Sequence, residues 1–118
     1  MKKILIVDHS IEIREKIISV LKDLNCTFHH CNDGLEAIEL YSRLKPDWVV
    51  MDMDLKQISG LVAAYQIRSR DPKANIIIIS NHDKFEFRQT AERYGVKHYL
   101  LKKDFFPLKD LILEKVAN

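Results

Sequence analysis

The sequence has few of the residues that build disulfide frameworks or linkers. Its 118 residues include two cysteines, three glycines and three prolines. Two cysteines cannot form the disulfide framework of a small secreted domain, so we expect free thiols and a cytoplasmic location. Glycine and proline do not gather anywhere into a flexible linker. We therefore expect a single domain that spans residues 1–118.

Long hydrophobic runs and a strong excess of charge are also missing. The longest purely aliphatic run, Ile76–Ile79, is far too short to span a membrane. The N-terminal lysines precede only a short apolar stretch, Ile4–Val7, and no small-residue cleavage site follows, so this segment predicts a strand rather than a signal peptide. The net charge is +2 and the basic residues are scattered, which argues against direct binding of nucleic acid.

Short apolar segments alternate with longer amphipathic ones. The apolar segments predict five strands, at residues 3–7, 27–31, 48–51, 75–80 and 97–101. Apolar residues at helical spacing predict five helices, at about residues 10–24, 33–44, 60–70, 84–94 and from 107 onward. This alternation predicts an α/β fold, with a five-stranded parallel, doubly wound sheet covered on both faces.

Some residues are expected to fix the ends and faces of these helices. Ser10 is a predicted N-cap, and Gly95 is predicted to end the fourth helix. The adjacent Phe105–Phe106 is expected either to pack beneath the last helix or to form an exposed apolar patch. The apolar residues expected to share the inner face of the second helix are Leu35, Ile38, Tyr41 and Leu44.

Polar residues stand where four of the predicted strands end. Asp8 follows the first strand, Asp52 the third, Ser80 the fourth and Lys102 the fifth. In open α/β sheets, ligands bind outside the carboxyl ends of the strands. Each residue taken alone has an ordinary explanation as a cap, a turn residue or a solvated side chain, but capping does not explain all four at one edge.

This set of residues indicates phosphoryl chemistry. Clustered carboxylates repel each other and need a cation, and hard oxygen ligands select Mg²⁺ or Ca²⁺. A hydroxyl and an ammonium add further partners for the oxygens of a transferring phosphoryl group. A carboxylate held there can act as the nucleophile. The residues therefore predict Mg²⁺-dependent phosphoryl transfer to an aspartate.

At this point the chain resembles the receiver domain of two-component response regulators, in particular the single-domain chemotaxis-type regulators. The resemblance implies a flavodoxin-like sheet with strand order 2-1-3-4-5. The segments that carry it are ILIVD (4–8), DGLEAI (33–38), DWVVMDMDLKQISG (47–60), IIIIS (76–80) and YGVKHYLLKK (94–103).

The resemblance assigns roles to three aspartates. Asp52 resembles the phosphoacceptor, eight residues before the loop glycine Gly60. Asp8 resembles the first residue of an acidic pair that holds Mg²⁺. Asp54 occupies the position whose backbone carbonyl is a metal ligand and whose side chain points toward the incoming phosphoryl group or water.

The remaining assignments concern the fourth and fifth strands. Ser80 resembles the hydroxyl residue that turns toward the phosphoryl group, and Tyr99 resembles the aromatic residue that swings inward with it. Lys102 resembles the lysine that pairs with the phosphoryl oxygens. Strand alternation from Tyr99 favours Lys102, whereas the residues that follow make Lys103 the alternative.

The chain departs from the family pattern at three positions. His9 replaces the second metal-binding acid, and imidazole is a poorer Mg²⁺ ligand than carboxylate, so we expect weakened Mg²⁺ affinity. The carboxylate of Asp54 is a candidate for partial compensation. Lys56 stands where the family usually has proline, and Asn81 stands where a small residue is common.

Three functions are open at this stage. The first is a regulatory phosphoacceptor, rather than a turnover enzyme, that receives a phosphoryl group from a sensor histidine kinase or phosphotransfer protein. Its output would pass to a partner or a second copy through the fourth helix, fifth strand and fifth helix. The second is a degenerate receiver that binds proteins without phosphorylation. The third is a phosphohydrolase that uses Asp52–Asp54, although such enzymes usually carry this motif on the first strand.

Overall fold

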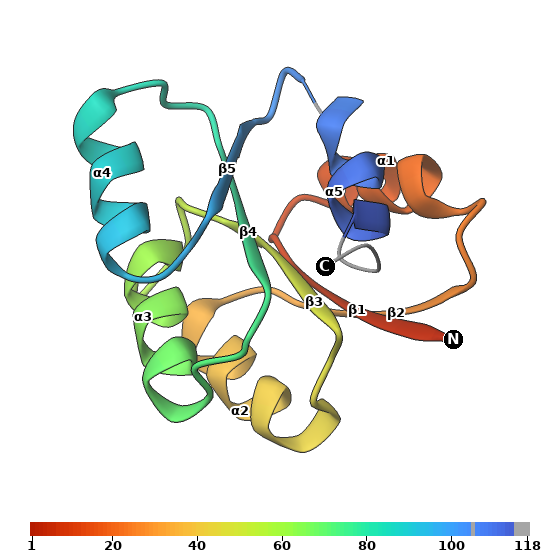
Figure 1. Cartoon of the computed structure of the whole chain (residues 1–118), viewed down its shortest axis with the longest axis horizontal. Coiled ribbons are helices and arrows are strands. Elements are labelled where there is room, and N and C mark those ends of the chain that lie inside the picture. Colours follow the sequence, from red (N-terminus) through yellow and green to blue (C-terminus); the bar gives the residue numbers. More distant parts are fainter. Residues whose placement is uncertain (105, 115–118) are drawn as a thin grey trace.

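The computed structural model describes residues 1–104 and 106–114. Strands and helices alternate along the chain from the N-terminus (Figure 1). The strands are β1 (Lys2–Val7), β2 (Cys26–Cys31), β3 (Trp48–Asp52), β4 (Ile76–Ser80) and β5 (His98–Leu101). The helices are α1 (Ile11–Leu21), α2 (Gly34–Leu44), α3 (Gly60–Arg70), α4 (Phe85–Arg93) and α5 (Phe106–Glu114).

The strands form one parallel sheet in the order β2-β1-β3-β4-β5. This confirms the predicted fold class and strand order. The chain moves outward from β1 to β2, then crosses back over β1 to β3, so the direction of winding reverses between β1 and β3. Ligand sites of doubly wound sheets lie at the carboxyl ends of the strands beside this point. Asp8 and Asp52 stand at those two ends.

Apolar cores on the two faces of the sheet hold the helices in place. Side chains of β1, β3 and β4 alternate between the faces, as strand geometry requires. One core joins the sheet to α1 and α5, through Ile17, Leu21, Leu108 and Ile112. The other joins it to α2, α3 and α4, and Figure 1 shows the two groups of helices on opposite sides. The central strands β3 and β4 are buried along their whole length.

The predicted helix ends are largely confirmed. The Ser10 hydroxyl accepts a hydrogen bond from the Ile13 backbone N–H at 3.3 Å, which caps α1. Gly95 follows α4 with a φ of +87°, a conformation that glycine adopts without steric cost. The first helix was predicted too long at its C-terminal end, because α1 ends at Leu21 rather than near Leu24.

The prediction for the inner face of α2 was wrong for Leu35, whose side chain is 51% exposed. Residues three apart on a helix are rotated by about 60° relative to each other, so a series of four such residues drifts halfway around the helix. Ile38 is buried and Tyr41 and Leu44 pack against the core, whereas Leu35 lies at the outer end of this drift. Ala37 is buried in its place.

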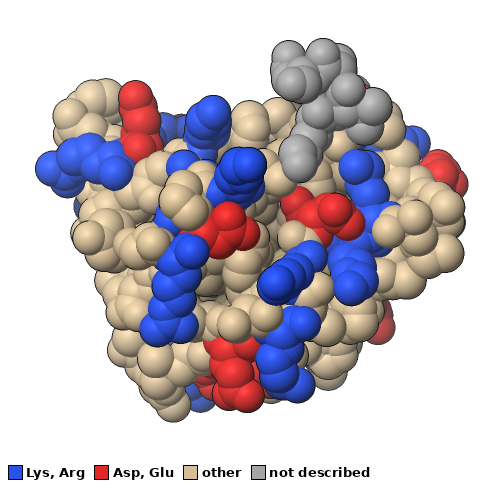
Figure 2. All heavy atoms as spheres, turned by 60° about the horizontal axis from the view of Figure 1, so that its bottom comes forward, with Lys and Arg blue, Asp and Glu red and all other residues tan. Residues whose placement is uncertain are grey.

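The surface carries mixed charge on the face shown in Figure 2, where lysine and arginine alternate with aspartate and glutamate. Within the described part of the chain, no helix is long and apolar enough to cross a membrane. The expectation for the Phe105–Phe106 pair lies outside the residues whose side chains the structure describes.

Candidate functional site

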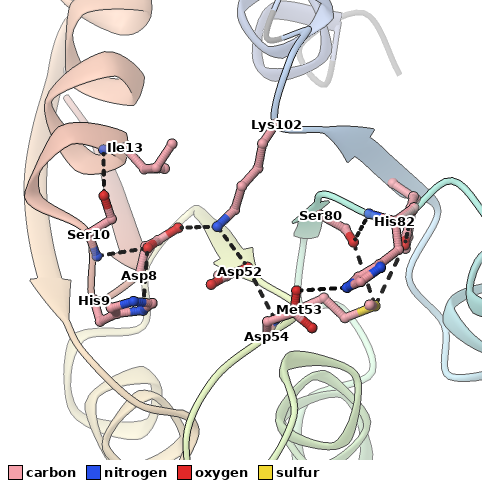
Figure 3. Close-up of polar contacts among 11 residues, drawn as sticks. Asp8, His9, Ser10, Ile13, Asp52, Met53, Asp54, Ser80, His82 and Lys102 are labelled. Atoms are coloured by element: carbon pink, nitrogen blue, oxygen red, sulfur yellow. Dashed lines mark hydrogen bonds and ion pairs between the residues drawn. The ribbon is translucent and has the colours of Figure 1, made fainter.

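Three polar residues at the carboxyl edge of the sheet are completely buried. Asp8 directly follows β1, Asp52 ends β3, and Ser80 ends β4. Figure 3 shows that they lie along one edge of the sheet, where the side chain of Lys102 reaches from the end of β5 toward Asp8 and Asp52. Buried charged groups are costly unless other charges or hydrogen bonds compensate them. Their burial therefore marks this edge as the chemically distinctive part of the molecule.

The ammonium of Lys102 bridges the two buried carboxylates. Its Nζ lies 3.1 Å from Asp52 Oδ1 and 3.4 Å from Asp8 Oδ2. Lys103, the alternative from the sequence, is exposed. Of the two lysines, the structure brings Lys102 to the aspartates. One ammonium against two carboxylates leaves this group with a net charge of −1 when both carboxyls are ionised.

Backbone N–H groups satisfy one oxygen of each carboxylate. Ser10 donates to Asp8 Oδ1 at 2.9 Å, and Asp54 donates to Asp52 Oδ1 at 3.1 Å. The second oxygen of each, Oδ2, is buried and accepts no hydrogen bond from the described residues, although Asp8 Oδ2 has the ion pair with Lys102. Buried polar atoms normally have partners, so a missing one needs an explanation. Two such oxygens beside a net negative charge fit a bound divalent cation, for which carboxylate oxygens are suitable ligands.

The pKa of Asp52 is raised above the ordinary carboxyl value. Burial is the main cause, and the nearby charge of Asp8 adds to it. The hydrogen bond from the Asp54 backbone and the ammonium of Lys102 act in the opposite direction. A cation at this site would favour the ionised carboxylate, which is the nucleophilic form.

His9 lies at the rim of the same cluster. Ligand atoms of Asp8, His9 and Asp52 all lie within 4.8 Å of one another, which makes them a candidate metal-binding group. The carboxylate of Asp54 was a candidate to compensate for the missing acid. Its Oδ2 lies instead 3.1 Å from Nε2 of His82, a residue in the loop after β4 (Figure 3).

His82 also connects Ser80 with Tyr99. Its backbone N–H donates to the Ser80 hydroxyl at 2.9 Å, and its carbonyl accepts from the Tyr99 hydroxyl at 2.8 Å. Tyr99 is buried, and the guanidinium of Arg88 lies over its ring at 4.8 Å from the ring centre. The hydroxyl residue and the aromatic residue predicted from the sequence are therefore linked through one loop residue.

Met53 is a part of this region that the sequence did not reveal. Its sulfur lies 3.6 Å from the Tyr99 hydroxyl oxygen and 3.9 Å from Ser80 Oγ. Methionine sulfur is a weak acceptor. The sequence feature that could have indicated the position of Met53 is strand alternation, because it turns Met53 to the side of the sheet opposite its neighbour Asp52.

Gly60 explains part of the local backbone geometry. Its N–H donates to the Met53 carbonyl at 2.8 Å, which folds the loop after β3 back toward the start of α3. A Cβ atom at Gly60 would overlap the carbonyl oxygen of Asp52. The glycine is therefore required by the close approach of two backbone segments.

The chain is similar to proteins of one family. The response regulator receiver domain model matches residues 4–113. The chemotaxis protein CheY of Listeria monocytogenes is 33% identical over 103 residues, which cover 86% of this chain and 87% of that protein. The response regulator TrrA of Thermotoga maritima, solved in complex with Mg²⁺–BeF, has a TM-score of 0.85 at 28% identity, covering 97% of this chain and 98% of that one. CheY of Borrelia burgdorferi, in a CheX–CheY–BeF3–Mg²⁺ complex, shares the fold with a TM-score of 0.85 at 22% identity, covering 99% and 90%.

Proposed function

Because this chain belongs to the response regulator receiver domain family, we propose that it is a regulatory phosphoacceptor whose accepting residue is Asp52. The observation that carries the proposal is the buried group of Asp8, Asp52 and Lys102 at the carboxyl edge of the sheet. The proposed donors are a sensor histidine kinase or a phosphotransfer protein, and the proposed location is the cytoplasm.

The proposed transfer uses the carboxylate of Asp52, whose Oδ1 is held by the Asp54 backbone and Lys102. An oxygen of this carboxylate attacks the phosphorus of a phosphohistidine, a P–O bond forms, and the P–N bond to the donor breaks. The electron pair of that bond stays on the imidazole. The hydrogen bond and ion pair to Oδ1 hold the carboxylate in orientation, which lowers the entropic cost of the reaction.

The oxygen ligands of the site suit the Mg²⁺ that the family implies. Asp8, Asp52 and the backbone carbonyl of Asp54 are the residues that would hold it. When bound, it supplies positive charge that offsets the repulsion between the carboxylates and the phosphoryl oxygens. Lys102 adds a second positive charge, and its ammonium is placed to pair with a phosphoryl oxygen. Ser80 offers a hydroxyl donor from the neighbouring strand.

The proposed output is a shift in the surface formed by α4, β5 and α5. Tyr99 links the site to this surface, because its hydroxyl contacts His82 and its ring lies under Arg88 of α4. A groove of about 480 Å³ lies here, lined by Arg88, Tyr99 and Leu111 among others. Movement of Ser80 toward a phosphoryl group would break its hydrogen bond to His82. Because His82 also accepts a hydrogen bond from Tyr99, this would shift the conformational equilibrium of the Tyr99 side chain. A partner protein or a second copy would read the change.

One observation favours the degenerate receiver as a second candidate. His9, and not an acid, stands beside Asp8 and Asp52 in the metal-binding group. If this substitution prevents cation binding, Asp52 cannot be phosphorylated efficiently and the domain acts as a phosphorylation-independent interaction module.

Intact mass distinguishes the two functions. The protein is incubated with Mg²⁺ and acetyl phosphate, and we expect the addition of one phosphoryl group that is lost in Asp52→Asn. Asp23→Asn is the matched control, because it makes the same change at an exposed position whose carboxylate pairs with Lys109. A wild-type mass that stays unchanged, while a control receiver is modified, would favour the degenerate receiver.

A further inference from the structure

The metal-binding group combines two kinds of ligand. Asp8 and Asp52 are completely buried and present carboxylate oxygens, whereas His9 is 61% exposed and presents an imidazole nitrogen. The ligand atoms of all three lie within 4.8 Å of one another, and His9 Nδ1 lies 3.9 Å from Asp8 Oδ1. The group is therefore accessible to solvent at His9 and buried at the two aspartates.

A second observation is that one carboxylate oxygen on the buried side of this group lacks a partner. Oδ2 of Asp52 is inaccessible to solvent and accepts no hydrogen bond from the described residues, and Oδ2 of Asp8, also buried, is paired with the ammonium of Lys102 at 3.4 Å. Lys102 contributes one positive charge against two carboxylates. A divalent cation between these oxygens would satisfy Oδ2 of Asp52 and balance the remaining charge.

The ligand chemistry discriminates among divalent cations. Mg²⁺ prefers oxygen ligands, in near-ideal octahedral geometry. Imidazole suits the later first-row transition metals, and the affinity of a given site for them rises from Mn²⁺ through Fe²⁺ and Co²⁺ to Cu²⁺. One nitrogen beside two carboxylate oxygens is thus a mixed donor set that favours Fe²⁺, Co²⁺ or Zn²⁺ over Mg²⁺.

We propose that this site selects a first-row transition-metal ion over Mg²⁺ and that His9 is the selecting ligand. The inference rests on the proposed function in that it concerns the same two aspartates. The inference goes beyond the proposed function because it makes His9 determine which cation binds, whereas the proposed function concerns only the ability to accept a phosphoryl group. A receiver of this kind would respond to transition-metal supply as well as to its kinase.

Direct binding tests this inference on the tag-free protein, with Co²⁺ as the probe. Calorimetry gives the affinities for Co²⁺ and Mg²⁺, and the visible absorption of Co²⁺ reports whether nitrogen enters its ligand shell. In His9→Asp we expect Co²⁺ to bind about tenfold more weakly, roughly the effect of losing one ligand interaction, and Mg²⁺ to bind more tightly. In His9→Ala we expect weaker Co²⁺ binding and no gain for Mg²⁺.

A matched control separates His9 from other histidines. His30 is exposed on β2, and His30→Asp introduces the same change in charge away from the site. We expect the ratio of Co²⁺ to Mg²⁺ affinity to fall in His9→Asp and to stay at the wild-type value in His30→Asp. A ratio that is the same in wild type and His9→Asp overturns the inference, and so does an equal fall in both variants.

The acetyl phosphate assay keeps this inference distinct from the proposed function. Phosphorylation of wild type together with an unchanged affinity ratio in His9→Asp overturns the metal assignment and leaves the phosphoacceptor function in place. Co²⁺ binding that requires His9, without phosphorylation in the presence of either metal, supports the metal assignment and overturns the phosphoacceptor function.

Discussion

Asp8 and Asp52 are two carboxylates without exposed surface, held beside each other at the ends of β1 and β3. Removing a carboxylate from water raises its free energy, and a like charge nearby raises it further. Lys102 and backbone N–H groups compensate only part of this cost, since the two carboxylates share one ammonium and Oδ2 of Asp52 has no partner among the described residues. The residues that we propose for chemistry therefore destabilise the cation-free fold.

Replacement of Asp52 by asparagine tests how much the buried charge of Asp52 destabilises the fold. Asp52→Asn keeps the shape of the side chain and removes the charge, so we expect the cation-free protein to be more stable at neutral pH by about 1 kcal/mol. For a domain of this size that corresponds to a rise in Tm of about 4 °C, measured by calorimetry in the presence of a chelator. A lower Tm in Asp52→Asn would contradict the expected cost of the buried charge.

The sign of the pH dependence follows from the raised pKa of Asp52. A carboxyl whose pKa is higher in the folded protein holds its proton more readily there than in the unfolded chain. Its destabilising effect is therefore complete above the folded-state pKa and declines as the pH falls through that value. We expect the difference in Tm between wild type and Asp52→Asn to shrink as the pH is lowered to about 4, near the ordinary carboxyl pKa.

His82 offers a second prediction at the level of single residues. Its imidazole lies 3.1 Å from the carboxylate of Asp54, the residue expected to face the phosphoryl group or its attacking water. His82→Ala releases the Asp54 carboxylate. We expect the released carboxylate to orient the attacking water better, which would shorten the lifetime of the phosphorylated protein. A contact of about 1 kcal/mol corresponds to a change of about fivefold. Loss of the phosphorylated mass over time measures the rate, and an unchanged rate in His82→Ala would contradict a role for this pair.

Among the elements, the loop between β3 and α3 fixes the position of Asp52. Gly60 approaches the Asp52 backbone so closely that any side chain would overlap the Asp52 carbonyl oxygen. We expect Gly60→Ala to lower stability by about 2 kcal/mol, because backbone rather than a flexible side chain must move. We also expect weaker acceptance of phosphoryl from acetyl phosphate, since the displaced atom belongs to Asp52.

A control for this effect comes from another glycine. At Gly95, which follows α4, an added Cβ would meet Arg68 side-chain atoms rather than backbone, and the φ of +87° adds strain for alanine. Gly95→Ala is expected to lower stability with little effect on the rate of phosphoryl transfer. If both alanine variants reduce this rate equally, the proposed local effect of Gly60 on Asp52 is wrong.

Helices α2 and α3 are joined by a hydrogen bond far from the site. The Tyr41 hydroxyl of α2 donates to Oδ2 of Asp71, the residue after α3, at 2.7 Å. This bond is the main reason that the pKa of Asp71 is lowered. We expect Tyr41→Phe to reduce the free energy of unfolding at neutral pH by about 1 kcal/mol, as measured by urea denaturation.

The pH dependence of this bond has the opposite sign to that of Asp52. A carboxyl with a lowered folded-state pKa stabilises the fold above its unfolded-state pKa, and this contribution is lost as the pH falls through the folded-state value. The difference between wild type and Tyr41→Phe should therefore shrink in acid. Tyr65→Phe, at an exposed position on α3, is the matched control and should leave the stability nearly unchanged at either pH.

For the whole molecule, the site and the stability of the fold are thermodynamically linked. A cation that binds only the folded state stabilises it by about 2.7 kcal/mol at a concentration one hundred times its dissociation constant. Because the site joins the ends of β1 and β3 at the centre of the sheet, we expect this stabilisation to raise the Tm of a single cooperative transition. The shift should be strongly reduced in Asp52→Asn, and a full shift in that variant would place the cation elsewhere.

The arrangement of the sheet was predictable because its signals are local. β3 and β4 are buried on both faces, so their sequences are continuous apolar runs, and each run ends at a polar residue at the carboxyl edge of the sheet. Asp52 and Ser80 were found at those ends for the same reason. The exposure of Leu35 was missed because four residues at a spacing of three drift halfway around the helix, and only the packing of α2 against the sheet shows which end of that series is exposed.

The sequence by itself determined the alternation of strands and helices, the family, and the set of polar residues at the carboxyl edge. These follow from periodic burial and from the kind of residue at each strand end, which are properties of short segments. Only the tertiary structure showed that Lys102 rather than Lys103 reaches both aspartates, and that Asp54 pairs with His82. It also brought His9 within ligand distance of Asp8 and Asp52. Such distances depend on how separate elements pack together, and no local pattern encodes them.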